Sequence, residues 1–285
     1  MVDIILDAVL DTLKLLPFLY LTYLVLEFIE EKAEAGSVRL VRQSGIWGPF
    51  AGSALGIIPQ CGFSAAASSL FAQRLISAGT LIAVFLSTSD EMLPIMISNA
   101  VPAGTILKIL GLKVLSGIAA GILADKVFRL CRHEGERIDL HELCEEENCG
   151  CEEHNIFVSA LLHTAQIAGF VLAVNMLLGF VINFVGEENL SSLILNKPVI
   201  GPVITGLVGL IPNCAASILI TELYLGGAMT AGSMLAGLLA ASGVGILVLF
   251  RINRRAMVDN VKILAYTLAC SVLIGVLTDL AGLTL

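Results

Sequence analysis

The sequence predicts an all-α, polytopic integral membrane protein that is built from two internal repeats. Its composition is 57% hydrophobic and 14% charged, with a mean hydropathy of +0.92, whereas soluble domains are about 45–50% apolar and about 25% charged. Eight apolar segments are long enough, at roughly 20 residues, to cross about 30 Å of hydrocarbon as helices. Two stretches that lie 153 residues apart, Gly56 to Cys61 and Gly209 to Cys214, are nearly identical. We therefore expect two related membrane halves.

The apolar segments fall four to each half, and the repeat extends well beyond the short motif. Gly48 matches Gly201 and Ser89 matches Ser242 at the same offset; after one residue of slippage, Asp125 matches Asp279. We expect a first membrane repeat at 1–128, a connecting loop at 129–154 and a second membrane repeat at 155–285. The predicted segments are 4–29, 48–73, 75–100, 103–126, 155–185, 199–224, 228–250 and 257–283.

The first segment carries acids but no early basic stretch. Asp3, Asp7 and Asp11 are spaced by four residues, so they share one face of a helix. That face lies either at the membrane interface or toward a polar interior. Because a basic region and a small-residue cleavage site are both missing, we expect no removable signal peptide.

The second and sixth segments each hold a proline, Pro59 and Pro212, at the centre of the repeated motif. Proline removes a backbone donor and disfavours helix at the residue before it. Each segment is therefore predicted to be a broken helix or a re-entrant hairpin. If both are hairpins, Lys and Arg distribute more in line with the positive-inside rule, and three crossings in each half make the repeats inverted. If all eight segments cross, the repeats are parallel.

The third segment contains an acidic pair, Asp90 and Glu91, after Ser87-Thr88-Ser89. A carboxylate near the centre of a membrane helix costs about 2.5 to 3.5 kcal/mol, so the pair is expected to face a cavity, a cation or a basic group. The alternative is a helix end in the headgroup zone. The matching residues of the second half are uncharged, Gly243 and Val244, which favours one asymmetric cation site between two similar scaffolds.

The candidate metal ligands combine hard and soft donors. Carboxylate, amide and hydroxyl oxygens suit Mn, Mg or Ca, whereas thiolates suit Zn, Cu(I) or other thiophilic species. A buried cysteine can also be a small hydrophobe, and His163 is a ligand, a proton carrier or a structural histidine. The predicted site residues are Asp90, Glu91, Ser89, Gln60, Asn213, Cys61, Cys214 and His163.

The connecting loop concentrates most of the remaining metal-binding residue types. It holds four of the seven cysteines and three of the four histidines, and such clustering in a polar connector is typical of metal capture. The spacing is not that of a zinc finger or ribbon, and a solvated charged linker is the alternative. The predicted capture residues are Cys131, His133, His141, Cys144, Cys149, Cys151 and His154.

On these motifs the chain resembles a known family, the arsenic-permease-like ten-helix heavy-metal exporters, some of which are labelled manganese transporters. The resemblance rests on the duplicated Gly-x-x-Pro-polar-Cys motif, on the run from Ser87 to Glu91 and on the His/Cys connector, and it covers most of the chain. It implies a multi-pass protein of the inner (cytoplasmic) membrane that exports a metal or metalloid. The eight predicted segments become the family's ten if each of the two broken segments counts twice.

The sequence carries no Walker-type nucleotide motif, so we expect a secondary-active efflux permease and not an enzyme. Its expected substrate is a divalent heavy metal such as manganese or a thiophilic species such as arsenic, moved by alternating access with protons as the coupling ion. We expect no permanently bound cofactor, the lipid bilayer as partner, no nucleic acid and a cytosolic connecting loop. A metal importer and a non-transporting metal sensor are the alternatives.

Overall fold

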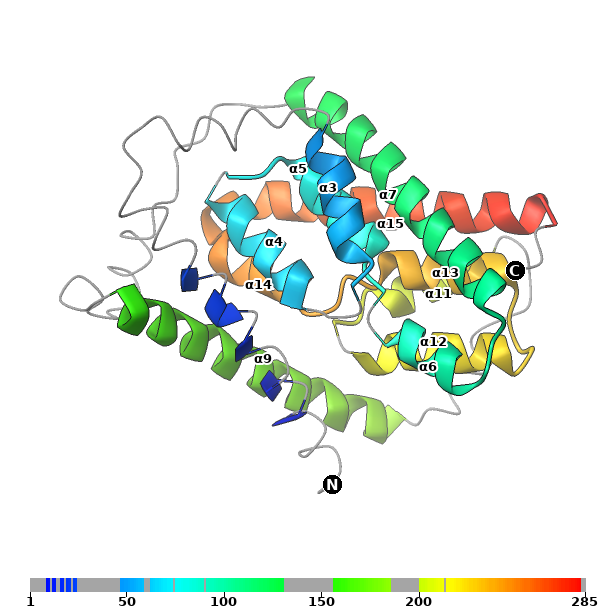
Figure 1. Ribbon diagram of the computed structural model, residues 1–285, viewed down its shortest axis with the longest axis horizontal. Coiled ribbons are helices and arrows are strands. Elements are labelled where there is room, and N and C mark those ends of the chain that lie inside the picture. The colour runs from blue at the N-terminus through cyan, green and yellow to red at the C-terminus, as the bar shows by residue number, and fades with distance from the viewer. Residues whose placement is uncertain are drawn as a thin grey trace.

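The computed structural model describes residues 9–10, 12–13, 16–17, 19–21, 23–24, 47–58, 62–73, 75–89, 91–130, 156–185, 200–212 and 214–282. Over these residues the chain is helical and contains no strand, which confirms the predicted all-α class (Figure 1). The main helices are α3 (Trp47–Gly56), α4 (Gly62–Ala72), α5 (Ala78–Ser87), α6 (Met92–Ser98), α7 (Ala103–Leu130), α9 (Ile156–Val185), α11 (Ile200–Gly209), α12 (Cys214–Leu225), α13 (Ala231–Ala240), α14 (Gly245–Ile252), the short 3₁₀ helix η2 (Arg254–Ala256) and α15 (Met257–Leu280).

The described helices form two matched series, in which α3 to α7 of the first half correspond to α11 to α15 of the second. In the first half α5 packs against α3 and α7, and in the second half α13 packs against α11 and α15. The repeat seen in the sequence is therefore also a repeat in packing. Whether the two halves are inverted in the membrane stays a prediction.

Helices α5 and α13 form the centre of the molecule. Every residue of α13 is buried, and Ala78 is the single residue of α5 that is not. Both helices are apolar around their whole circumference, which is the pattern of a helix enclosed by others. Phe85 on α5 and Leu235 on α13 are examples of their fully enclosed side chains.

The start of each central helix is fixed by an aspartate from the last helix of its own half. Asp125 on α7 accepts hydrogen bonds from the Ser77 hydroxyl and the Gly79 N–H, both at 2.9 Å. Asp279 on α15 accepts the matching bonds from Thr230, at 2.7 Å, and from Gly232, at 2.8 Å. A carboxylate is favourable at a helix N-terminus because it satisfies unpaired N–H groups and the helix dipole. We call these two groups the aspartate clamps.

Glycines allow the clamped helices to approach closely. A Cβ atom on Gly79 would lie 2.2 Å from the carbonyl oxygen of Gly121, and one on Gly232 would lie 2.1 Å from that of Gly275. No side chain fits at such distances. The matched glycines of the two halves therefore serve the same close helix crossing, and small residues of this kind are typical of helix contacts in membranes.

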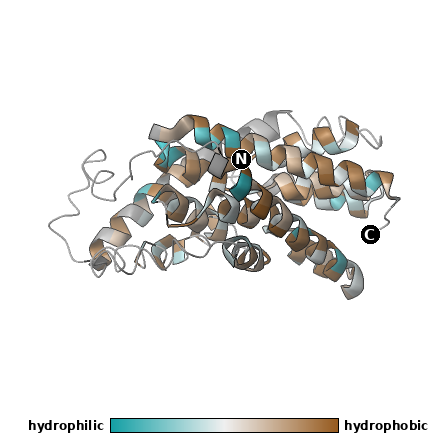
Figure 2. Cartoon of the chain, turned by 90° about the horizontal axis from the view of Figure 1, so that it is seen from above, coloured by the Kyte–Doolittle hydropathy of each residue, from teal (hydrophilic) through white to brown (hydrophobic). Residues whose placement is uncertain are grey.

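Four helical stretches are long and apolar enough to cross a membrane, judged by length and composition among the described residues. They are Ala78–Ser98, Ala103–Phe128, Ala231–Ile252 and Met257–Leu280. Large apolar side chains such as Leu107, Leu115 and Leu273 are exposed on the outer helices α7 and α15, and Figure 2 shows hydrophobic colouring along much of the helical surface. Outward apolar faces of this extent suit a lipid environment and not water.

Shorter helices of the two halves pack against each other. Helix α14 of the second half packs on α4 of the first, and α6 of the first half packs on α12 of the second. Figure 1 shows the α4–α14 pair and the α6–α12 pair on opposite sides of the molecular centre. Each contact is the counterpart of the other under the repeat.

The α4–α14 pair is further covered by α9 and by the described part of the N-terminal segment. Leu19 and Tyr23 share an apolar cluster with Ala65 of α4, Val171 of α9 and Val248 of α14. The Arg251 guanidinium also lies 4.9 Å from the centre of the Phe170 ring, a cation–π distance. The first helices of both halves therefore meet the same pair.

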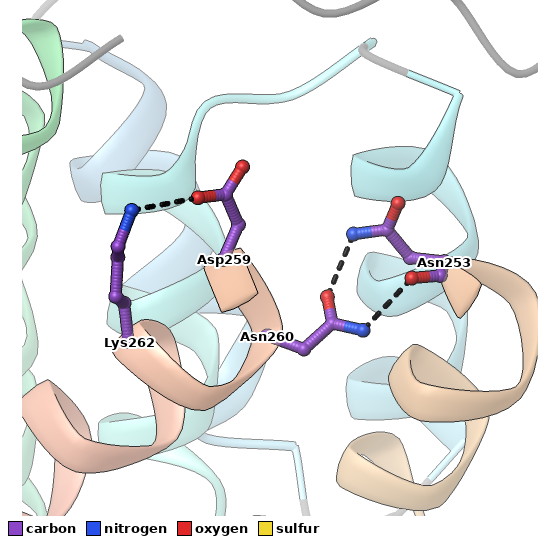
Figure 3. A network of polar contacts seen from close by, with 4 residues as sticks. All are labelled: Asn253, Asp259, Asn260 and Lys262. Atoms are coloured by element: carbon purple, nitrogen blue, oxygen red, sulfur yellow. Dashed lines mark hydrogen bonds and ion pairs between the residues drawn. The ribbon is translucent and has the colours of Figure 1, made fainter. Parts of the chain in front are cut away.

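The turn that leads from α14 into α15 is held by two buried asparagines (Figure 3). The Asn253 side-chain amide donates to Asn260 Oδ1 at 2.7 Å, and the Asn260 amide donates back to the Asn253 carbonyl oxygen at 2.9 Å. Nearby, Lys262 and Asp259 form an exposed ion pair at 3.1 Å. The reciprocal amide bonds fix the angle between the two helices.

Candidate functional site

The predicted membrane span at 75–100 is interrupted inside its polar run. Helix α5 ends at Ser87, Thr88 is its C-cap, and α6 begins after Glu91, which occupies the N-cap position. The Ser and Thr side chains of this run bond to backbone carbonyls, as hydroxyls also do inside the uninterrupted helix α15. The Ser87 hydroxyl donates to the Ala83 oxygen and the Thr88 hydroxyl to the Val84 oxygen, both one turn back.

The residues of this first interruption differ in exposure. Ser87, Thr88 and Ser89 are buried, with Ser89 only 1% exposed. Glu91 is half-buried, and its carboxylate forms no cap to α6. Pro94 lies in the first turn of α6, where a missing N–H costs no helical hydrogen bond. Two predicted ligands, Ser89 and Glu91, therefore stand at a helix break.

The second half is interrupted at the matching place, between the end of α13 at Ala240 and the start of α14 at Gly245. Gly243 adopts φ 55°, a left-handed conformation that glycine accepts without strain. Among the described residues, the buried hydroxyl of Ser242 has no hydrogen-bond partner, although such groups are normally paired. Sequence reasoning matched Ser89 with Ser242 and gave a helix end at the acidic pair only as the alternative, and it did not predict the second interruption.

Each interrupted helix lies against the motif helix of the other half. A Cβ atom on Gly245, the first residue of α14, would lie 2.7 Å from the Cβ of Ser64 in α4. The Ser68 hydroxyl also donates to the Gly245 carbonyl oxygen at 2.7 Å. The counterpart contact joins α6 to α12. The breaks and the duplicated motifs are thus parts of one arrangement.

The duplicated motifs each separate two short helices. In the first half α3 ends at Gly56 and α4 begins at Gly62; in the second half α11 ends at Gly209 and α12 begins at Cys214. Cys214 is buried at 8% exposure, and the Ser217 hydroxyl donates to its carbonyl oxygen at 2.8 Å. Pro212 lies in the bend just before α12. Whether these helix pairs are re-entrant stays a prediction.

Several predicted site residues fall outside the described part of the structure. The first group is Pro59, Gln60, Cys61, Asp90 and Asn213, and the second is the whole capture set of the connecting loop. His163 belongs to α9, but its side chain is not among those described. Within the described residues, no three His, Cys, Asp or Glu side chains come close enough to hold a metal ion. The proposed ligand set therefore stays a prediction.

The residue that sequence reasoning missed is Lys113. It lies near the middle of α7 and is only 1% exposed. Its Nζ donates to the Thr88 carbonyl oxygen at 2.5 Å and to the Leu238 carbonyl oxygen at 2.9 Å. The available signal was a lysine with only apolar and small residues within four positions on either side, Ser116 being the one polar residue among them and Lys108 lying just outside that stretch, because an ionisable residue inside the membrane usually marks a functional position.

The comparison with known families agrees with the architecture. Residues 1–176, more than half of the chain, match the family described as "Putative, 10TM heavy-metal exporter". No curated protein and no solved structure matches the chain. The matched region contains the first motif, the first interruption, Lys113 and the connecting loop. The protein is a multi-pass membrane protein and belongs to this heavy-metal exporter family.

Proposed function

We propose that the chain is a secondary-active efflux permease that moves a divalent heavy metal such as manganese, or a thiophilic species such as arsenic, by alternating access. The observation that carries this proposal is the crossing of two interrupted helices with the motif helices of opposite halves, α14 on α4 and α6 on α12. Irregular backbone at membrane depth is tolerated where it lines a cavity or is buried in protein. Transporters with internal repeats bind substrate at breaks of this kind.

The proposed ligands come from the breaks and from the motifs. Asp90, Glu91 and Ser89 belong to the first interruption, while Cys61 and Cys214 end the motifs. Among the described ligands, Glu91 stands at the N-cap of α6 and Cys214 is the first residue of α12, and these two helices pack together. The α6–α12 contact therefore supports a site that combines carboxylate and sulfur donors from both halves.

Movement of one half against the other would expose this site alternately to the two sides of the membrane. Protonation of Asp90 or Glu91 on the far side would release the metal ion and couple its export to proton entry. The proposed location is the inner membrane, with the connecting loop in the cytosol, where its thiols and imidazoles gather ions ahead of transport.

Flux through purified protein tests the proposal. The wild type and the Asp90→Asn/Glu91→Gln variant are reconstituted in proteoliposomes, and uptake of Mn, Zn, Co, Cd and arsenite is measured with an imposed proton gradient. We expect the wild type to move at least one of these species and the double variant to lose at least nine tenths of the flux. Asp259→Asn is the matched control, because Asp259 is an exposed acid on α15.

The outcomes also separate the two substrate classes and the alternatives. A Cys214→Ser variant should lose flux of a thiophilic substrate and retain flux of manganese, because thiolates are preferred by soft ions. Wild-type rates in the acid double variant would contradict the proposed mechanism. Gradient-driven accumulation of the substrate in inside-out vesicles indicates an exporter. Accumulation in right-side-out vesicles, without accumulation in inside-out vesicles, indicates an importer. A sensor transports in neither preparation.

A further inference from the structure

The interrupted helices of the two halves are joined by one buried ammonium group. Lys113 of α7 donates to the carbonyl oxygen of Thr88, the C-cap of α5, and to that of Leu238, in the last turn of α13. A helix C-terminus carries partial negative charge from its unpaired carbonyl groups. The lysine thus places one positive charge where the ends of two central helices meet.

The second half contains no matching charge. The residue that corresponds to Lys113 is Thr267, which is fully buried and donates to the Ile263 carbonyl oxygen of its own helix. The acids of the first interruption are replaced in the second by Gly243 and Val244. The lysine and the acidic pair therefore occur together in one half, and both are absent from the other half.

Lys113 contacts the residue next to Ser89, one of the proposed metal ligands that the structure describes. Its Nζ is 2.5 Å from a backbone atom of Thr88, and Thr88 directly precedes Ser89. Neighbouring Cα atoms are about 3.8 Å apart. An ion bound at the first interruption would therefore lie only a few residues along the chain from the Thr88 carbonyl oxygen that the ammonium contacts. Like charges repel strongly in such a buried setting, since the effective dielectric constant is far below that of water.

We propose that Lys113 is a specificity-determining residue of this transport site, which acts as a fixed internal cation. Its charge lowers the affinity of the acidic break for a divalent metal ion, so that the ion binds and is also released. Transport requires binding that is favourable enough to capture the ion and weak enough to let it leave. This inference rests on the proposed function and narrows its substrate to a divalent cation, because an uncharged metalloid acid would not sense the lysine.

Three variants at this position test the inference in proteoliposomes. Lys113→Met removes the charge with little change in volume, Lys113→Gln removes it but keeps an N–H donor for a carbonyl, and Lys113→Arg keeps the charge. Thr267→Met is the matched control in the other half. For each, the initial rate of manganese and of arsenite transport is measured over a range of substrate concentrations, which separates KM from kcat.

We expect the neutral variants to lower the KM for manganese at least tenfold and to lower kcat, because the ion binds more tightly and leaves more slowly. Lys113→Arg and Thr267→Met should keep the KM within threefold of the wild type. If the lysine had only a structural role, the neutral variants would lower kcat without lowering the KM for manganese.

Three results would overturn the inference while leaving the proposed function intact. The first is manganese transport by the wild type with an unchanged KM in the neutral variants. The second is a failure of both neutral variants to fold, judged by size-exclusion chromatography, while Lys113→Arg folds, since the lysine would then be only a structural tie. Transport of arsenite without any divalent ion would also overturn it. Absence of all transport by the wild type would instead contradict the proposed function.

Discussion

Removal of an aspartate clamp should destabilise the protein strongly and equally in the two halves. Asp279 accepts two hydrogen bonds, from Thr230 and from the Gly232 N–H, at the start of α13. A hydrogen bond to a charged group contributes about 1.5 to 3 kcal/mol. Because the carboxylate is only partly buried, we take the lower figure for each bond, so Asp279→Ala should cost about 3 kcal/mol.

The assay is thermal unfolding of the purified protein in detergent, followed by helical circular dichroism. In domains of comparable size, 1 kcal/mol shifts Tm by about 2–4 °C, so Asp279→Ala should lower Tm by roughly 6–12 °C. Asp279→Asn keeps one acceptor oxygen and should lower it by about half as much. The same pair of changes at Asp125 should give similar shifts, since it accepts the same two kinds of hydrogen bond, from a hydroxyl and from a glycine N–H, at similar distances.

Asp259 supplies the control on the same helix. Its ion pair with Lys262 is exposed, and such pairs contribute about 0.2 to 1 kcal/mol. The reasoning is refuted if Asp279→Ala shifts Tm no more than Asp259→Ala does. It is also refuted if the effects at Asp125 and Asp279 differ by more than a factor of three.

Three further changes test separate features of the fold by the same thermal assay. Gly245→Ala should destabilise the protein by about 1 to 3 kcal/mol, because the new Cβ would lie 2.7 Å from the Ser64 Cβ. Gly111→Ala is the control and should not destabilise the protein, because Gly111 has open space around it. Equal losses of stability in the two variants would contradict the α4–α14 contact. Ala100 has φ 53°, so Ala100→Gly should raise stability by up to about 1 kcal/mol, and a loss would argue against that turn. Ser242→Ala should raise stability by about 1 to 3 kcal/mol, because the buried hydroxyl has no partner in the described part of the chain; a loss of stability would show that the hydroxyl makes a stabilising hydrogen bond.

Much of the architecture could be predicted because it depends on patterns that the sequence shows directly. Hydropathy predicts membrane helices, and the match of Asp125 with Asp279 predicts a repeat. In the structure these matched residues form the two aspartate clamps. The residues matched because both perform the same packing task, although the sequence did not reveal what that task was.

The interruption after Ser87 was only the alternative interpretation of the acidic pair, and the interruption after Ala240 was not predicted, because hydropathy over a window does not register where a helix ends. The first break follows Ser and Thr bonds to carbonyls one turn back, which also occur inside the uninterrupted helix α15. The second depends on Gly243 and on the contact of Gly245 with the other half. Lys113 was missed for a related reason, since its carbonyl partners come from α5 and α13 and are brought together only by the fold.

The contact between the halves is the claim on which both proposals depend, and a single disulfide measures it directly. Cysteines are introduced at Ser64 and Gly245 in a cysteine-free background, with a protease site in the connecting loop. A Cβ atom on Gly245 would lie 2.7 Å from the Cβ of Ser64, closer than the 3.5–4.5 Å of a disulfide, so α4 and α14 must separate by about 1 Å for the bond to form. After oxidation and cleavage, we expect the two halves to migrate as one covalently joined species, while a Gly111/Gly245 cysteine pair stays separate. Separation of the Ser64/Gly245 halves under the same conditions would contradict the account.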